Sequence, residues 1–154
     1  MASRIDEIFA ALAQVPVAFN NAVVTTFNID ELPESVDNRH TPCRLLIPLG
    51  TRAEARSITP ITINGEVATI AWRATDLFLM KPVGLTGGIA AEAPNLVAYM
   101  QAYVNAMQMV GFRLLSSAQI ENMAFEPTIT PFPTSGNTQF FAIEVSLTIK
   151  EICQ

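Results

Sequence analysis

The sequence predicts an α+β fold, in which two main helices pack on a largely antiparallel or mixed sheet of about four to six strands. Three observations lead to this class: a helical pattern near the N-terminus, a second one over residues 93–112, and several alternating or β-branched segments. The chain has 154 residues, which is the size of one domain. We therefore expect residues 1–154 to form a single domain.

The N-terminal segment predicts a short helix. Ser3 is the expected N-cap, and Asp6 and Glu7 place negative charge in the first turn, where it suits the helix dipole. Pro16 is expected to end the helix, because proline cannot continue it. One apolar stripe follows the helical period: Ile5, Ile8, Phe9 and Leu12.

The segments that follow predict strands separated by loops. Residues 23–27 are rich in β-branched side chains and indicate a short strand, and residues 44–49 indicate a second one. Between them, residues 30–42 are polar and contain two prolines, so we expect a long protruding loop. Residues 50–57 are interpreted as a solvated connection.

The longest extended region runs from residue 61 to residue 81. Asn64-Gly65 is a typical type I′ hairpin turn. The strand expected after it, over residues 66–81, carries apolar side chains on both parities, which indicates that both of its faces are covered. The glycine-rich residues 82–88 are expected to form a flexible link to the next helix.

The second helix is predicted over residues 93–112, a stretch of twenty residues without any charge. Pro94 is expected to open the helix and Gly111 to close it. A helix on the surface of a monomer normally shows charged residues to water. We therefore expect its own sheet to cover one side and another copy of the chain to cover the rest. A core helix of a monomer and a membrane span remain as alternatives, the second weakened by the amide side chains within the stretch.

The C-terminal region predicts a β-hairpin. Apolar and polar residues alternate from Phe141 to Lys150, so one face of this strand is expected to lie in the core. Residues 119–126 are its expected hairpin partner. The connection over residues 127–138 is too long for a tight turn and predicts a second protruding loop.

The composition narrows the function classes. Charged residues make up 15% of the chain, against the usual quarter, and the net charge is −5. An acidic chain argues against a nucleic-acid-binding surface. The two cysteines, Cys43 and Cys153, form no metal or disulfide pattern. The N-terminus lacks the apolar stretch of a signal peptide, so residence in the cytosol is expected.

No pattern in the sequence predicts an active site, a cofactor site or a metal site. His40 lies near Cys43, but we interpret it as a loop residue rather than the base of a nucleophile. The run Gly84–Gly88 is not followed by the Lys-Ser or Lys-Thr pair of a phosphate loop. Trp72 is interpreted as a core residue of its strand. Four carboxylates on predicted strands are interpreted as facing solvent: Asp76, Glu121, Glu126 and Glu144.

The order of elements resembles that of the tail terminator, or tail completion, proteins of long-tailed bacteriophages. A short helix precedes strands, and the long strand carries AWRATDLFLMKPVG over residues 71–84. A glycine-rich link leads to the helical run LVAYMQAY over residues 96–103. The last hairpin runs from FEP at residues 125–127 to FFAIEV at residues 140–145. The resemblance covers roughly residues 3–150.

This resemblance implies a structural virion protein without catalysis or cofactor. It implies a homo-oligomer, a hexameric ring that caps the tail tube and ends its polymerisation. The implied partners are the major tail tube protein below and the head–tail connector above, with DNA passing through the lumen without specific binding. It also implies a place in the tail or neck of the virion, and in the host cytoplasm during assembly.

The same reasoning assigns contact surfaces. The uncharged helix and the long strand are the expected subunit contacts, and the two protruding loops are the expected contacts between rings. Other tail or neck rings, a connector or a tube subunit, remain alternatives, as does a ligand-binding or enzymatic α+β domain. The expected subunit contacts are Trp72, Phe78, Met80, Tyr99, Tyr103 and Met107. The expected loop contacts are Asp37, Arg39 and Phe132.

Overall fold

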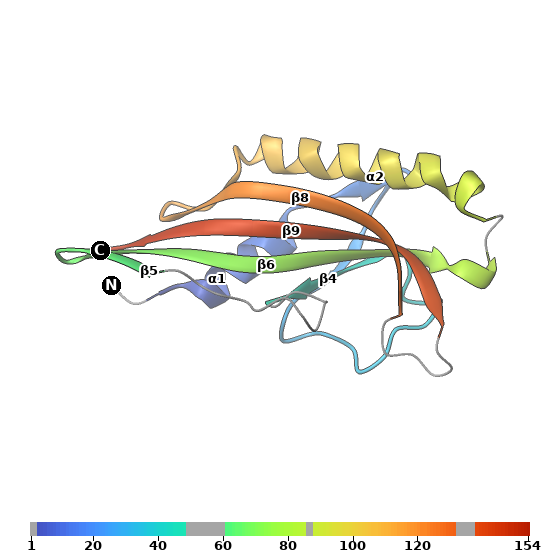
Figure 1. The fold of residues 1–154 in the computed structure, drawn as a ribbon, viewed down its shortest axis with the longest axis horizontal. Coiled ribbons are helices and arrows are strands. Elements are labelled where there is room, and N and C mark those ends of the chain that lie inside the picture. The colour runs from blue at the N-terminus through green and yellow to red at the C-terminus, as the bar shows by residue number, and fades with distance from the viewer. Residues whose placement is uncertain (1–2, 49–60, 86–87, 132–137) are drawn as a thin grey trace.

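The computed structural model describes residues 3–48, 61–85, 88–131 and 138–154. These residues form the α+β fold predicted from the sequence: two helices and a mixed, strongly curled sheet that makes a half-barrel (Figure 1). The helices are α1 (Ile5–Gln14) and α2 (Ile89–Met109), with a short 3-10 helix η1 (Val83–Leu85) before α2. The strands are β1 (Ala18–Phe19), β2 (Ala22–Val23), β3 (Thr25–Phe27), β4 (Cys43–Ile47), β5 (Ile61–Asn64), β6 (Val67–Pro82), β7 (Arg113–Leu115), β8 (Ala118–Pro131) and β9 (Gln139–Cys153).

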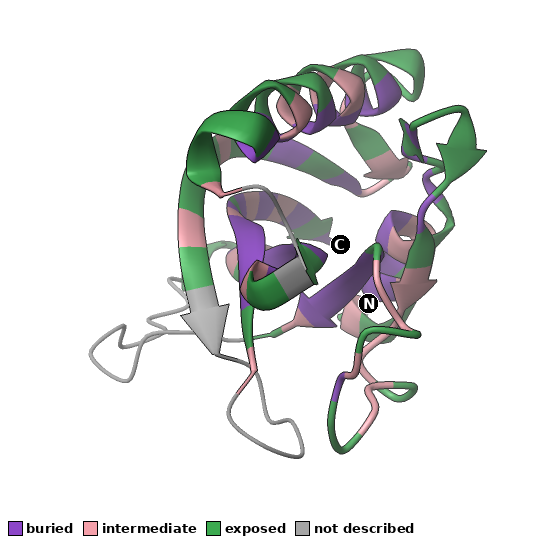
Figure 2. Cartoon of the chain, turned by 90° about the vertical axis from the view of Figure 1, so that its right-hand side faces the viewer, coloured by how far each residue is buried: buried purple, intermediate pink, exposed green. Residues whose placement is uncertain are grey.

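The sheet is built on three long strands, β6, β9 and β8. Its main path runs β3-β4-β6-β9-β8-β7, and β5 pairs with the start of β6. Only the β3–β4 pair is parallel among the described strand pairs. In the end-on view the sheet curls around a concave side, which α1, α2 and the β1–β2 hairpin occupy (Figure 2).

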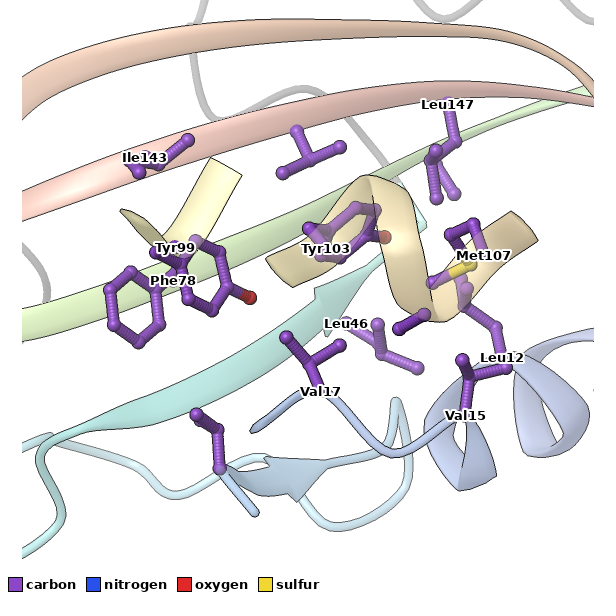
Figure 3. Packing of buried hydrophobic residues seen from close by; sticks show 14 of the residues in the cluster. Leu12, Val15, Val17, Leu46, Phe78, Tyr99, Tyr103, Met107, Ile143 and Leu147 are labelled. Atoms are coloured by element: carbon purple, nitrogen blue, oxygen red, sulfur yellow. The ribbon is translucent and has the colours of Figure 1, made fainter. Parts of the chain in front are cut away.

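The main core fills this concave side. The alternation predicted for the C-terminal strand is confirmed, because Phe141, Ile143, Val145, Leu147 and Ile149 of β9 are all buried there. They pack with Leu12 of α1 and with Tyr99, Tyr103 and Met107 of α2 (Figure 3).

A smaller second core lies on the convex side. Leu77 and Leu79 of β6 and Leu45 of β4 pack there against Val36 of the loop between β3 and β4. This confirms that both faces of the long strand β6 are covered near its end. The loop expected over residues 30–42 is confirmed too, since no helix or strand interrupts it.

Helix α2 begins earlier than the sequence analysis expected. It starts at Ile89, so Pro94 lies inside the helix and does not open it. Three alanines between residues 90 and 93 favour the helical state, and Glu92 adds negative charge to the first turn. Pro94 is exposed. Gly111, with φ of +63°, follows the end of the helix as predicted.

Helix α1 is not capped by Ser3. The N-cap is Arg4, and no side chain caps the helix. The Ser3 hydroxyl instead donates a hydrogen bond of 2.8 Å to the Glu151 carboxylate on β9. A distant buried carboxylate therefore takes the hydroxyl that the local pattern assigned to the cap.

The tight turns differ from the predicted one. Asn64 is the last residue of β5 and pairs with Val67, so the turn residues are Gly65 and Glu66. Of these only Gly65 has a left-handed φ, +64°, which is the pattern of a type II′ turn and not of type I′. The two-residue turn with left-handed φ at both positions is Asn20-Asn21, between β1 and β2.

Two further boundaries were wrong. The strand expected over residues 23–27 is divided between β2 and β3. The loop expected over residues 127–138 is shorter, because β8 continues to Pro131 and pairs with Gln139. The expected connection over residues 50–57 lies outside the described residues.

Candidate functional site

Helix α2 presents two different faces. Its inner face is buried against the sheet through five residues besides Glu92: Leu96, Tyr99, Tyr103, Ala106 and Met107. The Tyr99 ring stacks on Phe78 of β6, with centroids 3.6 Å apart and planes 6° apart. The Tyr103 ring meets Phe125 of β8 edge-on at 5.8 Å. These contacts fix which side of the helix faces the core.

The opposite side, here called the α2 outer face, is exposed and carries no charge. Val97 is 59% exposed and Met109 is 88% exposed. Three amide side chains, Gln101, Asn105 and Gln108, are exposed with them. The remaining exposed members are small or apolar: Ile89, Ala90, Ala91, Ala93, Pro94, Ala98 and Val110. A long helix face without any Lys, Arg, Asp or Glu is an unusual surface to leave in water.

The position of α2 depends on a buried charged network. Arg44 of β4 and Asp76 of β6 form an ion pair with both side chains at 0% exposure. The Tyr103 hydroxyl donates a hydrogen bond of 2.8 Å to Asp76 Oδ2, and Arg44 Cζ lies 5.6 Å from the centre of that ring. Arg44 Nη1 also donates to the Val15 carbonyl at 2.8 Å. The network therefore joins both helical regions to two strands.

The pKa directions indicate fixed charge states in this network. Burial alone would lower the pKa of Arg44, but the negative charge of Asp76 and their hydrogen bonds raise it above its usual value. Burial raises the pKa of Tyr103 well above its usual value, and the neighbouring Asp76 raises it further. A guanidinium and a neutral phenol, both closed off from solvent, act here as structural groups.

Asp76 corrects one expectation of the sequence analysis, which placed it at the surface. The signal that identifies it is its position within the strand. Asp76 shares the parity of Trp72, Ala74, Phe78 and Met80, all of which the main core contacts. A lone carboxylate on an apolar parity needs a buried partner.

A second buried carboxylate holds the start of α1. Glu151 of β9 is 1% exposed and accepts hydrogen bonds from the Arg4 amide at 2.6 Å and from Trp72 Nε1 at 2.7 Å. Burial raises its pKa, but these hydrogen bonds and the one from Ser3 outweigh burial, so the pKa of Glu151 lies below its usual value. Trp72 is confirmed as a residue packed against the core.

The predicted subunit contacts are wrong for most of their residues. Five side chains are enclosed by their own chain at 0% or 1% exposure and have no surface to offer a neighbour: Phe78, Met80, Tyr99, Tyr103 and Met107. The sixth, Trp72, is half-buried and bonded to Glu151. The helical period selected the side that packs inward, and the uncharged surface is the other side.

Two of the three predicted loop contacts lie among the described residues. Asp37 and Arg39 lie in the loop between β3 and β4, where the exposed Arg39 guanidinium forms an ion pair with Asp37 at 2.7 Å. This ion pair lowers the pKa of Asp37 through its hydrogen bonds. Phe132 lies outside the described residues.

The Cys43–His40 pair has the wrong properties for a nucleophile and its base. Cys43 is fully buried in the convex core, and burial raises the pKa of its thiol to about 12. His40 Nδ1 accepts a hydrogen bond from the Asp37 amide at 3.0 Å. Since the reactive form of cysteine is the thiolate, this thiol stays protonated and unreactive at neutral pH.

The start of α2 also differs from a phosphate site. Glu92, 6% exposed, lies in its first turn and accepts a hydrogen bond of 2.9 Å from the Asn95 side chain. Lys81 Nζ lies 3.9 Å from the same carboxylate. The chain's own carboxylate therefore takes the place that an anion prefers.

No family model matches the chain, and no curated protein matches it. Within residues 3–48, 61–85, 88–131 and 138–154 no cluster of three His, Cys, Asp or Glu side chains is placed to hold a metal ion. Neither described helix is long and apolar enough to span a membrane.

Proposed function

We propose that this chain is a ring-forming structural protein of a bacteriophage tail, a terminator that caps the tail tube and joins it to the head connector. The sequence resemblance to tail terminators supports the proposal. So does the α+β fold, in which a long helix lies along a curled sheet. The proposed ring is a hexamer of this chain, and its neighbours are the tube protein on one side and the connector on the other.

One observation carries the self-association: the exposed α2 outer face without charge. A monomer of net charge −5 that leaves this face in water has an unfavourable surface, whereas a subunit that covers it does not. The amides Gln101, Asn105 and Gln108 suit a protein neighbour, because each side chain both donates and accepts hydrogen bonds. An acidic chain also suits a conduit through which DNA slides without binding.

The experiment is native mass spectrometry of the purified chain, with negative-stain images of the same sample. Closed rings are expected for the wild type. Val97→Lys combined with Met109→Lys places two charges on the α2 outer face, where both side chains are exposed, so the fold is retained and the rings are lost. Val23→Lys is the matched control, since Val23 is 65% exposed and belongs to β2, not to the α2 outer face. A wild type that stays monomeric, or rings unaffected by the α2 charges, would contradict this assignment.

The copy number of this chain in purified virions distinguishes a terminator from a tube subunit. A terminator contributes one ring, whereas a tube subunit contributes many. Quantitative mass spectrometry of virions measures this ratio. A chain absent from virions would overturn the proposal entirely.

A further inference from the structure

Among the described residues, β3 and β7 end the main path of the curled sheet, and β8 and β5 also have an open side. On its outer side β8 pairs with β7 only at Ala118 and Gln119. Over residues 122–125 no described strand pairs with this side of β8. On the other edge β5 pairs with β6, and no described strand pairs with the outer side of β5. An open strand edge presents unpaired backbone donors and acceptors that can accept another strand.

Only part of β8 is suited to pairing. Pro127 and Pro131 lie in its second half, and proline brings no N–H to a new strand pair. The stretch from Asn122 to Phe125 contains neither proline nor charge. Strand β5 has the same length of four residues, and it too lacks proline and charge. The two open stretches therefore match in length and lack the features that usually block strand addition.

The side chains of the two stretches also match face by face. In β8, Met123 and Phe125 are half-buried on the concave face, opposite Leu147 and Val145 of β9. In β5, Ile61 lies opposite Ile70 of β6, which itself lies opposite the buried Glu151 of β9, so Ile61 is on the concave face too.

Ile63 shares this parity with Ile61. Both isoleucines are exposed, at 58% and 75%, although they extend the apolar face of the sheet. On the convex face both stretches are polar or small: Thr62 and Asn64 in β5, Asn122 and Ala124 in β8. A sheet that continued from β8 into β5 would keep its apolar side concave and its polar side convex.

We propose that β5 of one copy adds to the open edge of β8 of the next copy, so that the curled sheet continues from subunit to subunit. This inference rests on the self-association in the proposed function and names the strands that carry it. Because β5 and β8 are different edges of one molecule, the contact is heterologous, the kind that closes into a ring. The contact also places Ile61 and Ile63 of one copy beside the concave side of the next copy, where α2 runs alongside β8 (Figure 1).

Cross-linking of single cysteines tests the strand pairing. Thr62→Cys and Ala124→Cys are prepared as two separate variants, since both residues are exposed on the convex face and tolerate a small change. With a short bis-maleimide reagent, an equal mixture of the two is expected to give about tenfold more covalent dimer than either alone, because pairing holds the two thiols together. Val23→Cys mixed with Ala124→Cys is the control and is expected to give background. The native cysteines, Cys43 and Cys153, are both buried.

A complementation experiment tests the direction of the contact. The β5 variant carries Ile61→Lys and Ile63→Lys. The β8 variant carries Asn122→Lys and Ala124→Lys, because both residues are exposed. Phe125 is not changed, since a lysine at this half-buried position would damage the fold. Each variant alone is expected to lose its rings. A mixture is expected to stop at heterodimers, since one intact β5 and one intact β8 remain in it.

The outcomes separate this inference from the proposed function. Wild-type rings without cross-links between residues 62 and 124 overturn the strand pairing and leave the ring intact. Covalent dimers of Thr62→Cys with itself overturn the heterologous contact in favour of a two-fold one. A wild type that remains monomeric overturns both proposals.

Discussion

Two regions of this molecule reverse the usual distribution of charge. The Arg44–Asp76 pair carries full charges at 0% exposure, whereas the α2 outer face lies in water with no charge at all. The two regions lie on opposite sides of α2, because Tyr103 on the inner side of this helix donates a hydrogen bond to Asp76. The interior charges hold the inner side of the helix in place, while its exposed side carries no charge.

The two regions place different demands on their residues. A buried ion pair contributes little net stability relative to an apolar core, but its geometry must be satisfied in full. Arg44 meets this demand with Asp76, the Val15 carbonyl and Thr26 Oγ1. The α2 outer face has no such requirement, so its residues can change without disturbing the fold. Mutations should therefore divide cleanly between effects on folding and effects on association.

The largest effect is expected from Asp76→Ala. It leaves the Arg44 guanidinium buried without its counter-charge and should reduce the free energy of unfolding by about 3–5 kcal/mol. Urea denaturation followed by circular dichroism measures this loss. Glu34→Ala, at an exposed carboxylate in the loop between β3 and β4, is the control and should change stability by less than about 0.5 kcal/mol. Equal midpoints for the two variants would refute a structural role of the network.

The sequence predicted the features of the fold that local residue patterns determine. The alternation in β9 selected the buried residues of that strand correctly, because this pattern reports the side of a strand that packs on the core. It could not predict that Arg44 pairs with Asp76, since 32 residues separate them and no local spacing relates them. The same limit explains Ser3, whose hydroxyl bonds to Glu151 across 148 positions.

The contact surface failed for a different reason. Helical periodicity finds the apolar side of a helix, and in α2 that side is the core. The exposed side is marked by missing charge and not by a stripe of large apolar residues. Gln101, Asn105 and Gln108 are the better indicators of it.

Two neighbouring tyrosines give a matched pair with a smaller effect. Tyr103→Phe removes a hydrogen bond to a buried carboxylate and should cost about 1.5–3 kcal/mol. The Tyr99 hydroxyl is buried as well, but no described group forms a hydrogen bond with it. Tyr99→Phe should therefore be neutral or stabilising, because it removes an unsatisfied polar group. Thermal unfolding of both variants gives the comparison, and a Tyr99→Phe loss as large as that of Tyr103→Phe would contradict it.

The second buried carboxylate should make stability depend on pH. The pKa of Glu151 is lower in the folded chain than its usual value of 4.5, so the folded state favours the carboxylate. Its contribution to the free energy of unfolding is complete when the pH lies above that usual value. This contribution is lost as the pH falls through the pKa of the folded state. Glu151→Gln should remove this acid-side loss while leaving the rest of the pH profile in place. Urea midpoints measured from pH 7 down to about pH 3 test it, and unchanged acid sensitivity in the variant would assign the dependence to other groups.

The smallest effect on folding is expected where the effect on association is greatest. Val97→Lys and Met109→Lys change side chains that already meet water, so each should alter the free energy of unfolding by less than about 0.5 kcal/mol. In a dilute, monomeric sample the urea midpoint should match that of wild type. At concentrations where wild type assembles, the variants should melt at lower temperature, since association stabilises only the chain that associates. Equal melting temperatures across a concentration series would show that the α2 outer face stays in water, and the contrast between the two regions would then concern folding alone.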